Sequence, residues 1–292
     1  MLRKKSNAEH IFDTCNYTFL FLLSVTAIYP IIYVALASIS NAAEVARHRG
    51  ILLYPLGISL KAYEAVFRNP NILIGYRNTF FYIVVGTVLN IALTTLAAFV
   101  LSRKRFKFRN LMMKLFVFTM MFSGGLIPLY LQVQQLGLFD TRFAIILPTA
   151  ISTYNMIIMH TAFGAVPDSL EESAKMDGAN DFVILFKIIL PLSKATLSVI
   201  TLFYCTTRWN EWFSAAIFIR SRALYPLQLI LREILIQNEI SNMTGSDAVD
   251  AMLLGTTIKY AAIIVSTVPI LFVYPFVQKY FVTGVMLGAV KE

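Results

Sequence analysis

Six stretches of the chain are each about 20 residues long and mostly apolar, which is the length that an α-helix needs to cross a lipid bilayer. Lipid offers no hydrogen-bond partner to the backbone, so a spanning segment must satisfy its own amides and carbonyls, as a helix does. The sequence therefore predicts an all-α integral membrane protein. The six predicted spans cover residues 17–39, 80–101, 111–133, 143–163, 195–219 and 258–280.

The third of these spans is interrupted. Ser123, Gly124 and Gly125 follow one another within it, and Pro128 comes soon after. Proline removes a backbone donor and clashes with the preceding turn of a helix. We expect this span to unwind or kink in a protein-lined environment.

The composition supports the membrane assignment. Hydrophobic residues make up 58% of the chain and charged residues 14%, whereas soluble domains have about 45–50% and about 25%. The chain shows no tandem repeat and no low-complexity tract, so we describe residues 1–292 as a single transmembrane domain.

The basic residues predict topology rather than nucleic-acid binding. The formal net charge is +9, but the Lys and Arg residues flank apolar runs instead of gathering on a soluble face. Five of them crowd the link between the second and third spans, namely Arg103, Lys104, Arg105, Lys107 and Arg109. Because short cytoplasmic loops are enriched in Lys and Arg, both termini are expected in the cytoplasm and residues 220–257 on the outer face.

The outer segment 220–257 carries a helical pattern of its own. Pro226 is a favourable residue at a helix start, and apolar residues then recur on one face, namely Leu227, Ile230, Leu231, Ile234 and Leu235. The pattern predicts a helix that lies on the membrane surface or packs over the bundle. A lid, or a docking surface for an external protein, is the alternative.

Residues 166–194, between the fourth and fifth spans, are too charged for lipid yet are strongly patterned. Pro167, Asp168 and Ser169 form a helix start, Gly178 breaks the run, and residues 181–190 form a second apolar-rich stretch that ends at Pro191. We expect a short helix, a glycine-based turn and a second short helix on the cytoplasmic side. Ordinary loop filling is the alternative.

The spacing within this segment is specific. Glu172, Ser173 and Ala174 are followed after three residues by Gly178, and after nine more by the sequence Ile188, one residue, Leu190 and Pro191. This order resembles the EAA motif, EAA-x3-G-x9-I-x-L-P, of ABC importer permeases, with Ser173 in place of an alanine. The three residues Asp177, Gly178 and Ala179 are similar to the DGA that often fills the centre of that motif.

The resemblance extends over essentially the whole chain. It includes residues 78–79, 96–103, 124–128, 137–141, 209–212, 225–228 and 284–291. Together these segments resemble the carbohydrate-uptake permeases, in particular the maltose-permease second subunit and the branch associated with oligosaccharides and polysaccharides. The resemblance implies an ABC importer type I permease (MetI-like) fold, with six transmembrane helices and a cytoplasmic coupling helix, in a bacterial cytoplasmic membrane.

The same resemblance implies how the motif works. In the family it forms a coupling helix that docks on a cytoplasmic ATPase and converts ATP-driven closure into movement of the membrane helices. Glu172 and Asp177 are the expected charged anchors, or else caps that hold the turn. The residues that the resemblance assigns to coupling are Glu171, Glu172, Ser173, Ala174, Asp177, Gly178, Ala179, Ile188, Leu190 and Pro191.

The chain has no G-x-x-x-x-G-K-[ST] motif, so we expect ATP and Mg to bind to separate ATPase subunits and no cofactor to bind to this chain. It is not expected to be an enzyme itself. The family implies four kinds of partner: a second homologous permease, two cytoplasmic ATPase subunits, an extracellular or periplasmic solute-binding protein and an oligosaccharide or polysaccharide substrate. The lipid bilayer surrounds the assembly, and no nucleic acid is involved.

Polar and aromatic residues near the middle of the fifth span are candidates for the substrate path. Arg208 and Glu211 are three residues apart on one helical face, so we expect them to pair inside the bundle. Trp209, Trp212 and Tyr204 are able to stack on sugar rings, and Asn210 is able to bind hydroxyl groups. The alternative is structural: an ion pair that fixes helix register, with the tryptophans in an interfacial belt.

Other classes of function fit the sequence poorly. A secondary transporter would show inverted repeats and an intramembrane carboxylate, but the halves of the chain are not visibly repeated. A membrane-embedded enzyme would need a cluster of catalytic groups at one depth, and His10, His48 and His160 are scattered. The sequence supports no metal site, and the distant Cys15 and Cys205 support no disulfide.

Overall fold

The computed structural model describes residues 7–244 and 255–272, and these residues form helices joined by short loops. The described part contains no named strand and a single isolated bridge between Ser40 and Ile58. The first nine labelled helices are α1 (Asn7–Ser38), α2 (Ala42–Arg47), α3 (Lys61–Arg68), α4 (Pro70–Ser102), α5 (Arg109–Met121), α6 (Leu126–Gln135), α7 (Phe143–Ile146), α8 (Thr153–Gly164) and α9 (Asp168–Met176).

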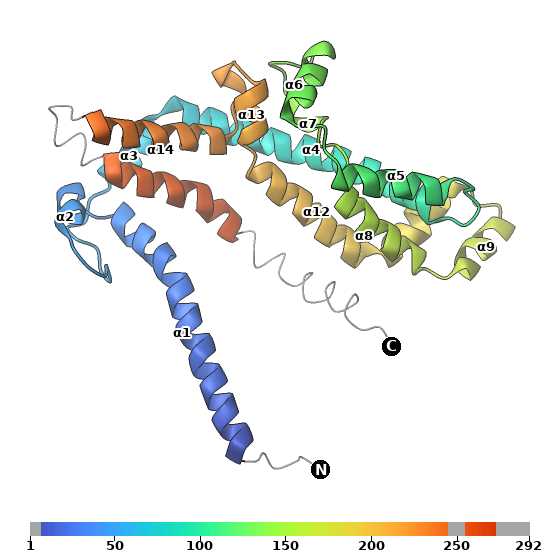
Figure 1. The fold of residues 1–292 in the computed structure, drawn as a ribbon, viewed down its shortest axis with the longest axis horizontal. Helices are drawn as coiled ribbons and strands as arrows, with labels where there is room; N and C mark the ends of the chain where they lie inside the picture. The colour runs from blue at the N-terminus through green and yellow to red at the C-terminus, as the bar shows by residue number, and fades with distance from the viewer. Residues whose placement is uncertain (1–6, 245–254, 273–292) are drawn as a thin grey trace. The chain divides into compact units, whose positions relative to one another are not determined.

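The remaining elements follow a turn at Gly178. They are α10 (Asp181–Ile184), the π-helical turn η1 (Leu185–Ile189), α11 (Leu190–Leu192), α12 (Lys194–Trp209), α13 (Phe213–Phe218), the 3-10 turn η2 (Arg222–Leu224), α14 (Leu227–Thr244) and an unlabelled helix Gly255–Phe272. Figure 1 labels α12, α13 and α14 among them.

Within residues 7–244 and 255–272, three helices are long and apolar enough to cross a membrane, namely α1, α4 and Gly255–Phe272. Two bent pairs raise the possible number of spans to five: Arg109–Met121 with Leu126–Gln135 at 115°, and Asp181–Leu192 with Lys194–Trp209 at 87°. The first bend lies at Ser123–Gly125, where Gly125 has φ +89°, so the predicted interruption of the third span is confirmed. The set of six spans stays a prediction, because residues 273–280 lie outside the described part.

Two predicted spans are not continuous helices. Residues 143–163 divide into α7 and α8, because Pro148 lacks a backbone donor and Ser152 starts a new helix by accepting a hydrogen bond from the amide of Asn155. Residues 195–219 divide into α12 and α13 at residues 210–212. The second span is longer than predicted, since α4 begins at Pro70, a favourable first helical position.

The chain divides into two units. In the first unit, residues of α1 contact both a later loop and α3. The Tyr29 hydroxyl accepts a hydrogen bond from the amide of Leu52 in the loop at 3.1 Å, and Ser38 Oγ lies 2.8 Å from the hydroxyl of Tyr63 in α3. Tyr33 also packs edge-on against Tyr260 at 5.8 Å between ring centroids.

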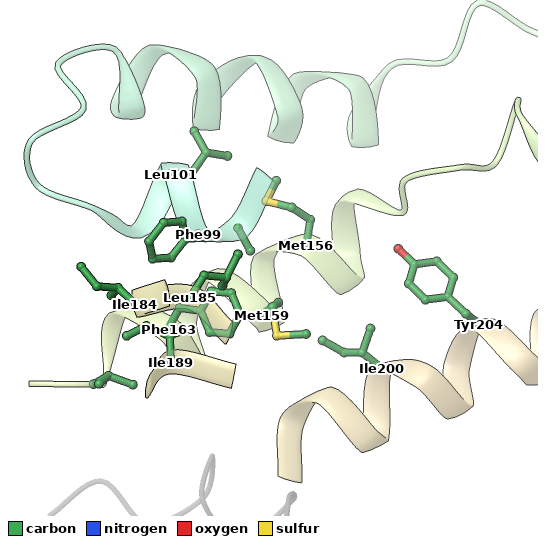
Figure 2. Packing of buried hydrophobic residues seen from close by; sticks show 12 residues of the cluster. Phe99, Leu101, Met156, Met159, Phe163, Ile184, Leu185, Ile189, Ile200 and Tyr204 are labelled. Atoms are coloured by element: carbon green, nitrogen blue, oxygen red, sulfur yellow. The ribbon is translucent and has the colours of Figure 1, made fainter. Parts of the chain in front are cut away.

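The second unit contains the bundle of α4, α8 and α12, in which α4 packs against both other helices (Figure 1). Figure 2 shows the apolar core that joins these helices to the segment after α9. Its labelled members are Phe99, Leu101, Met156, Met159, Phe163, Ile184, Leu185, Ile189, Ile200 and Tyr204.

The helix predicted after Pro226 is confirmed as α14. Its first turns pack onto the bundle, since Leu227, Ile230 and Leu231 are buried. The N-terminal half of α4 holds the start of α14 and the turn before it. Thr79 Oγ1 accepts a hydrogen bond from the amide of Leu227 at 2.9 Å, and Asn78 donates to the carbonyls of residues 223 and 225.

Candidate functional site

The predicted helix, turn and helix of residues 166–194 are present. The turn is held by the backbone: the amide of Gly178 donates to the carbonyl of Lys175 at 3.0 Å, and that of Ala179 to Ala174 at 2.9 Å. These two bonds form a Schellman motif, whose left-handed position is occupied by Gly178 with φ +78°. Glycine is favoured here because residues with a Cβ rarely adopt that conformation.

The second helix of the segment starts at a polar cap and is anchored by apolar residues. Asn180 Oδ1 accepts a hydrogen bond from the amide of Val183 at 2.9 Å, which satisfies one of the free donors of the first turn. Ile184, Leu185 and Ile189 are fully buried in the core of Figure 2. The segment does not end at Pro191, because α11 continues to Leu192 before the bend at Ser193.

Two of the small motif residues face this chain rather than outward. Ala174 and Ala179 are partly buried against the apolar core, which is the contact that accompanies a Schellman motif. The residues on the other side are exposed, namely Glu172, Ser173, Asp177 and Gly178. Met176 is also exposed on this side and is one of the most exposed apolar side chains of the described part. From the sequence we did not predict its exposure.

The side chains of Glu172 and Asp177 do not cap the turn. Within the described residues neither carboxylate accepts a hydrogen bond or forms an ion pair. The turn is held by backbone bonds and the next helix is capped by Asn180, so the capping interpretation of these two residues is wrong. Both remain available on the exposed side of α9.

Glu171 points the opposite way from Glu172. It is buried, its Oε2 accepts a hydrogen bond from Arg103 at 2.6 Å, and its Oε1 accepts one from Lys175 at 2.5 Å. Burial alone raises the pKa of the Glu171 carboxyl, but the hydrogen bonds and charges of Lys175 and Arg103 outweigh it, and the pKa lies below its ordinary value. Glu171 therefore stays ionised and attaches α9 to the bundle.

Lys104 and Arg105, which follow Arg103 in the loop after α4, also form ion pairs with residues of the 166–194 segment. Lys104 donates to Asp168 at 2.5 Å, and this hydrogen bond lowers the pKa of the Asp168 carboxyl. Arg105 pairs with Asp181, the first residue of α10. From the sequence we predicted that these basic residues determine topology, and we did not predict their acidic partners. The three basic and three acidic residues of the two neighbouring loop segments could have indicated that ion pairs join them.

A cavity of about 1070 Å³ lies in the second unit, away from this segment. Its walls are mostly apolar with scattered hydroxyl groups. They include Phe80, Ser152, Tyr154, Tyr204, Thr207 and Trp209. Among the described lining residues Arg208 is the one charged side chain.

Arg208 is 2% exposed, and its hydrogen-bond acceptors among the described residues are all neutral. Its Nη1 donates to the carbonyl of Ile145 at 2.9 Å, and its Nη2 donates to Asn90 Oδ1 at 3.0 Å and to the carbonyl of Ile146 at 3.1 Å, with a longer contact to Thr149 at 3.4 Å. The pairing expected with Glu211 is wrong, because Glu211 Oε1 instead accepts from the amide of Ser214 at the start of α13.

Tyr204 and Asn90 complete the same network. The Tyr204 hydroxyl accepts a hydrogen bond from the amide of Ser152 at 3.0 Å, and Asn90 donates to the carbonyls of Thr149 and Ala150 at 2.7 Å. With Arg208 they satisfy the backbone of the break between α7 and α8, where helical hydrogen bonds are missing. The free carbonyls of this break accept hydrogen bonds from the Arg208 guanidinium, which is why it does not bind the Glu211 carboxylate.

The chain matches the model of the family described as "Binding-protein-dependent transport system inner membrane component" over residues 72–286. The chain belongs to this family. The permease is 40% identical to Protein LplC of Bacillus subtilis over 98% of its own length and 97% of that protein. It is 42% identical to the polygalacturonan/rhamnogalacturonan transport system permease protein YtcP of Bacillus subtilis, over 97% and 99% of the two chains.

A solved structure shares the fold of the permease. A chain of a bacterial ABC transporter involved in the import of the acidic polysaccharide alginate superposes with a TM-score of 0.88 at 36% identity, over 95% of the permease and 99% of that chain. The MetI-like fold and the assignment as a non-catalytic ABC permease subunit, first inferred from the EAA spacing, are thereby confirmed.

The structure separates the six residues predicted for the substrate path of the permease. Tyr204, Arg208 and Trp209 line the cavity, whereas Asn210, Glu211 and Trp212 do not. Trp209 is buried edge-on against Tyr76 and Phe80. The Trp212 ring is covered by the Arg232 guanidinium at 3.6 Å. Within the described residues, no group of three or more His, Cys, Asp and Glu side chains lies close enough to hold a metal ion.

Proposed function

We propose that this permease carries acidic oligosaccharides or polysaccharide fragments across the membrane. The relatives support the class, since YtcP is named for polygalacturonan and rhamnogalacturonan and the solved transporter imports alginate, an acidic polysaccharide. Polymers of this kind carry carboxylate groups along their length. The question for this chain is therefore whether its cavity favours a negative charge.

Arg208 is the observation that carries the proposal. It is buried on the cavity wall, and its described hydrogen-bond acceptors are three backbone carbonyls and the Asn90 amide, none of which is charged. Glu211 attracts Arg208 electrostatically but forms no ion pair with it. A buried cation without a paired counter-ion is unfavourable in a membrane protein unless something compensates its charge. A carboxylate in the cavity supplies that compensation, whereas a neutral sugar does not.

The exposed side of α9 and of the turn after it is the proposed docking site for an ATPase. Glu172 and Asp177 are exposed there, and Ser173 and Gly178 leave room for close approach. The coupling residues of this side are then Glu172, Ser173, Asp177 and Gly178, while Glu171, Ala174, Ala179 and Leu190 attach the segment to the bundle. Ile188 is half-buried and Pro191 is exposed, so neither is assigned to a contact. Two ATPase subunits bind ATP and Mg, a second homologous permease completes the pore, and a solute-binding protein delivers the substrate from outside.

The orientation follows from the same assignment. Residues 166–194 face the cytoplasm if they meet the ATPase, and the Arg103–Arg109 cluster then lies on the cytoplasmic side, as the distribution of Lys and Arg favours. Both termini are cytoplasmic in this arrangement. The membrane is the cytoplasmic membrane of a bacterium.

Uptake by cells that carry the complete transporter tests the substrate class. Labelled trigalacturonate and labelled maltotriose are compared for the wild type, Arg208→Lys and Arg208→Gln. We expect the wild type and the lysine variant to favour trigalacturonate, because both keep the positive charge, and the glutamine variant to lose that preference several-fold. A wild-type preference for maltotriose, or an equal loss of preference in both variants at equal membrane levels, would overturn the proposal.

A further inference from the structure

Three consecutive basic residues at the end of α4 pair with three acids of the cytoplasmic segment. Arg103 pairs with Glu171 in the middle of α9, and Lys104 with Asp168 at the first residue of that helix. Arg105 pairs with Asp181, the first residue of α10. Both helices of the segment are thus attached to one loop, and α4, whose end carries that loop, is the helix against which α8 and α12 pack.

Arg103 differs from its two neighbours because it is buried. Its side chain is 5% exposed and that of Glu171 is 10%, whereas the Lys104 and Asp168 side chains are 75% and 54% exposed. Exposed ion pairs contribute little because water and salt screen them. Removing one partner of a buried pair leaves an uncompensated charge, which is strongly unfavourable. Arg103 is therefore expected to carry most of the attachment.

The guanidinium of Arg103 joins three helices at once. Its Nη1 donates to Glu171 of α9 at 2.6 Å, and its Nη2 donates to the carbonyl of Phe163, in the last turn of α8, at 2.7 Å. It also lies 5.3 Å from the centroid of the Phe99 ring of α4. The planar, forked guanidinium makes these contacts in fixed directions, which an ammonium group does not reproduce.

We propose that Arg103 is a positioning residue that makes α9 move as one body with α4 and α8. The inference rests on the proposed role of α9 as the ATPase docking helix. A helix of nine residues is too short to hold its shape alone in water. When a partner displaces Glu172, the Arg103 contacts transmit the displacement to the two membrane helices. Without them α9 bends or frays, and ATP is hydrolysed without matching transport.

The test compares Arg103→Gln with Lys104→Gln, a control in the adjacent residue with the same change in charge. The full transporter is purified, and hydrogen exchange of the amides of residues 168–178 is measured together with saccharide transported per ATP hydrolysed. Breaking the buried pair is expected to speed exchange in α9 about tenfold or more, because local opening becomes easier. It is also expected to lower the transport per ATP several-fold. Lys104→Gln should change neither quantity by more than about twofold.

Arg103→Lys is the conservative variant and should restore part of the transport per ATP, because an ammonium keeps the charge beside Glu171. Unchanged exchange in Arg103→Gln, or an equal fall in transport per ATP for Lys104→Gln, would overturn the proposal. Failure of the proposed function is seen separately. In that case no ATPase copurifies with the wild-type chain, while the exchange measurement still reports on the Arg103 contact.

Discussion

Gly86 of α4 leaves the space that Arg208 occupies: a Cβ on this glycine would lie 2.8 Å from Nε of the arginine. Real Cβ atoms essentially never come this close, so Gly86→Ala must push the guanidinium away from its carbonyl acceptors. We expect the variant to lower the free energy of unfolding by about 1–3 kcal/mol, as overpacked cores do. The measurement is the midpoint of thermal unfolding in detergent.

Gly164→Ala is the matched control for that change. Gly164 is the last residue of α8, and a Cβ there would meet no atom within 4 Å. Alanine also favours the helix more than glycine does. Its unfolding midpoint should equal or slightly exceed that of the wild type, and a similar loss in both glycine variants would contradict the explanation by contact with Arg208.

Substitutions of Gly178 test whether coupling depends on the backbone conformation of the turn. Its φ is +78° and a Cβ would meet no described atom within 4 Å, so Gly178→Ala meets no steric clash within the chain. The left-handed conformation still costs an alanine about 1–2 kcal/mol. We expect Gly178→Ala to lower the ATPase activity of the assembled transporter and Gly178→Asn to lower it less, because Asn tolerates this conformation. Equal activities of the two variants would argue against the turn as the cause.

The two neighbouring glutamates should behave oppositely. Glu172→Lys changes an exposed side chain, so the chain should fold normally while less ATPase copurifies with it from detergent-solubilised membranes. Glu171→Gln leaves Arg103 buried without its counter-ion, so the chain itself should be less stable. Quantitative mass spectrometry of the copurified proteins and thermal unfolding separate the two effects. Undiminished recovery of the ATPase with Glu172→Lys would remove Glu172 from the docking site.

Asp140 links two turns through its carboxylate, and this contact predicts a pH dependence of stability. Its carboxylate accepts hydrogen bonds from the hydroxyl and the amide of Ser221 and from the amide of Arg220, and these lower its pKa, the hydroxyl most. Because the pKa is lowered by folding, the stabilisation is complete above the ordinary value, about 3.9, and disappears as the pH falls through the folded value. Asp140→Asn tolerates the local φ of +57° and should lose this dependence in acid unfolding measurements.

Local signals in the sequence were sufficient to predict the helix, turn and helix of residues 166–194. Gly178, the acidic first turn of α9 and the polar start before α10 each act on backbone groups a few residues away, so their effect is visible in the sequence. The direction in which each side chain points was harder to predict from the sequence. Glu171 and Glu172 are adjacent, and which one turns inward depends on Arg103, which lies 68 positions away in the chain from Glu171.

The partner of Arg208 could not be predicted for a related reason. Helical spacing pointed to Glu211, but the break between α7 and α8 creates free carbonyls that compete for the guanidinium. Residues 143–163 are mostly apolar, so their composition predicted one continuous span. Composition indicates affinity for lipid, but it does not show that Pro148 interrupts the helix. Long-range satisfaction of backbone groups, rather than side-chain spacing, decided the geometry.

The same network sets an order for membrane insertion. The carbonyls at the break between α7 and α8 are satisfied by Asn90, which is synthesised before them, and by Arg208, which is synthesised about 60 residues after them. A ribosome adds about 5–20 residues each second, so the break waits several seconds for its second partner. Until then the carbonyls that Arg208 binds lack a partner, and lipid cannot supply one.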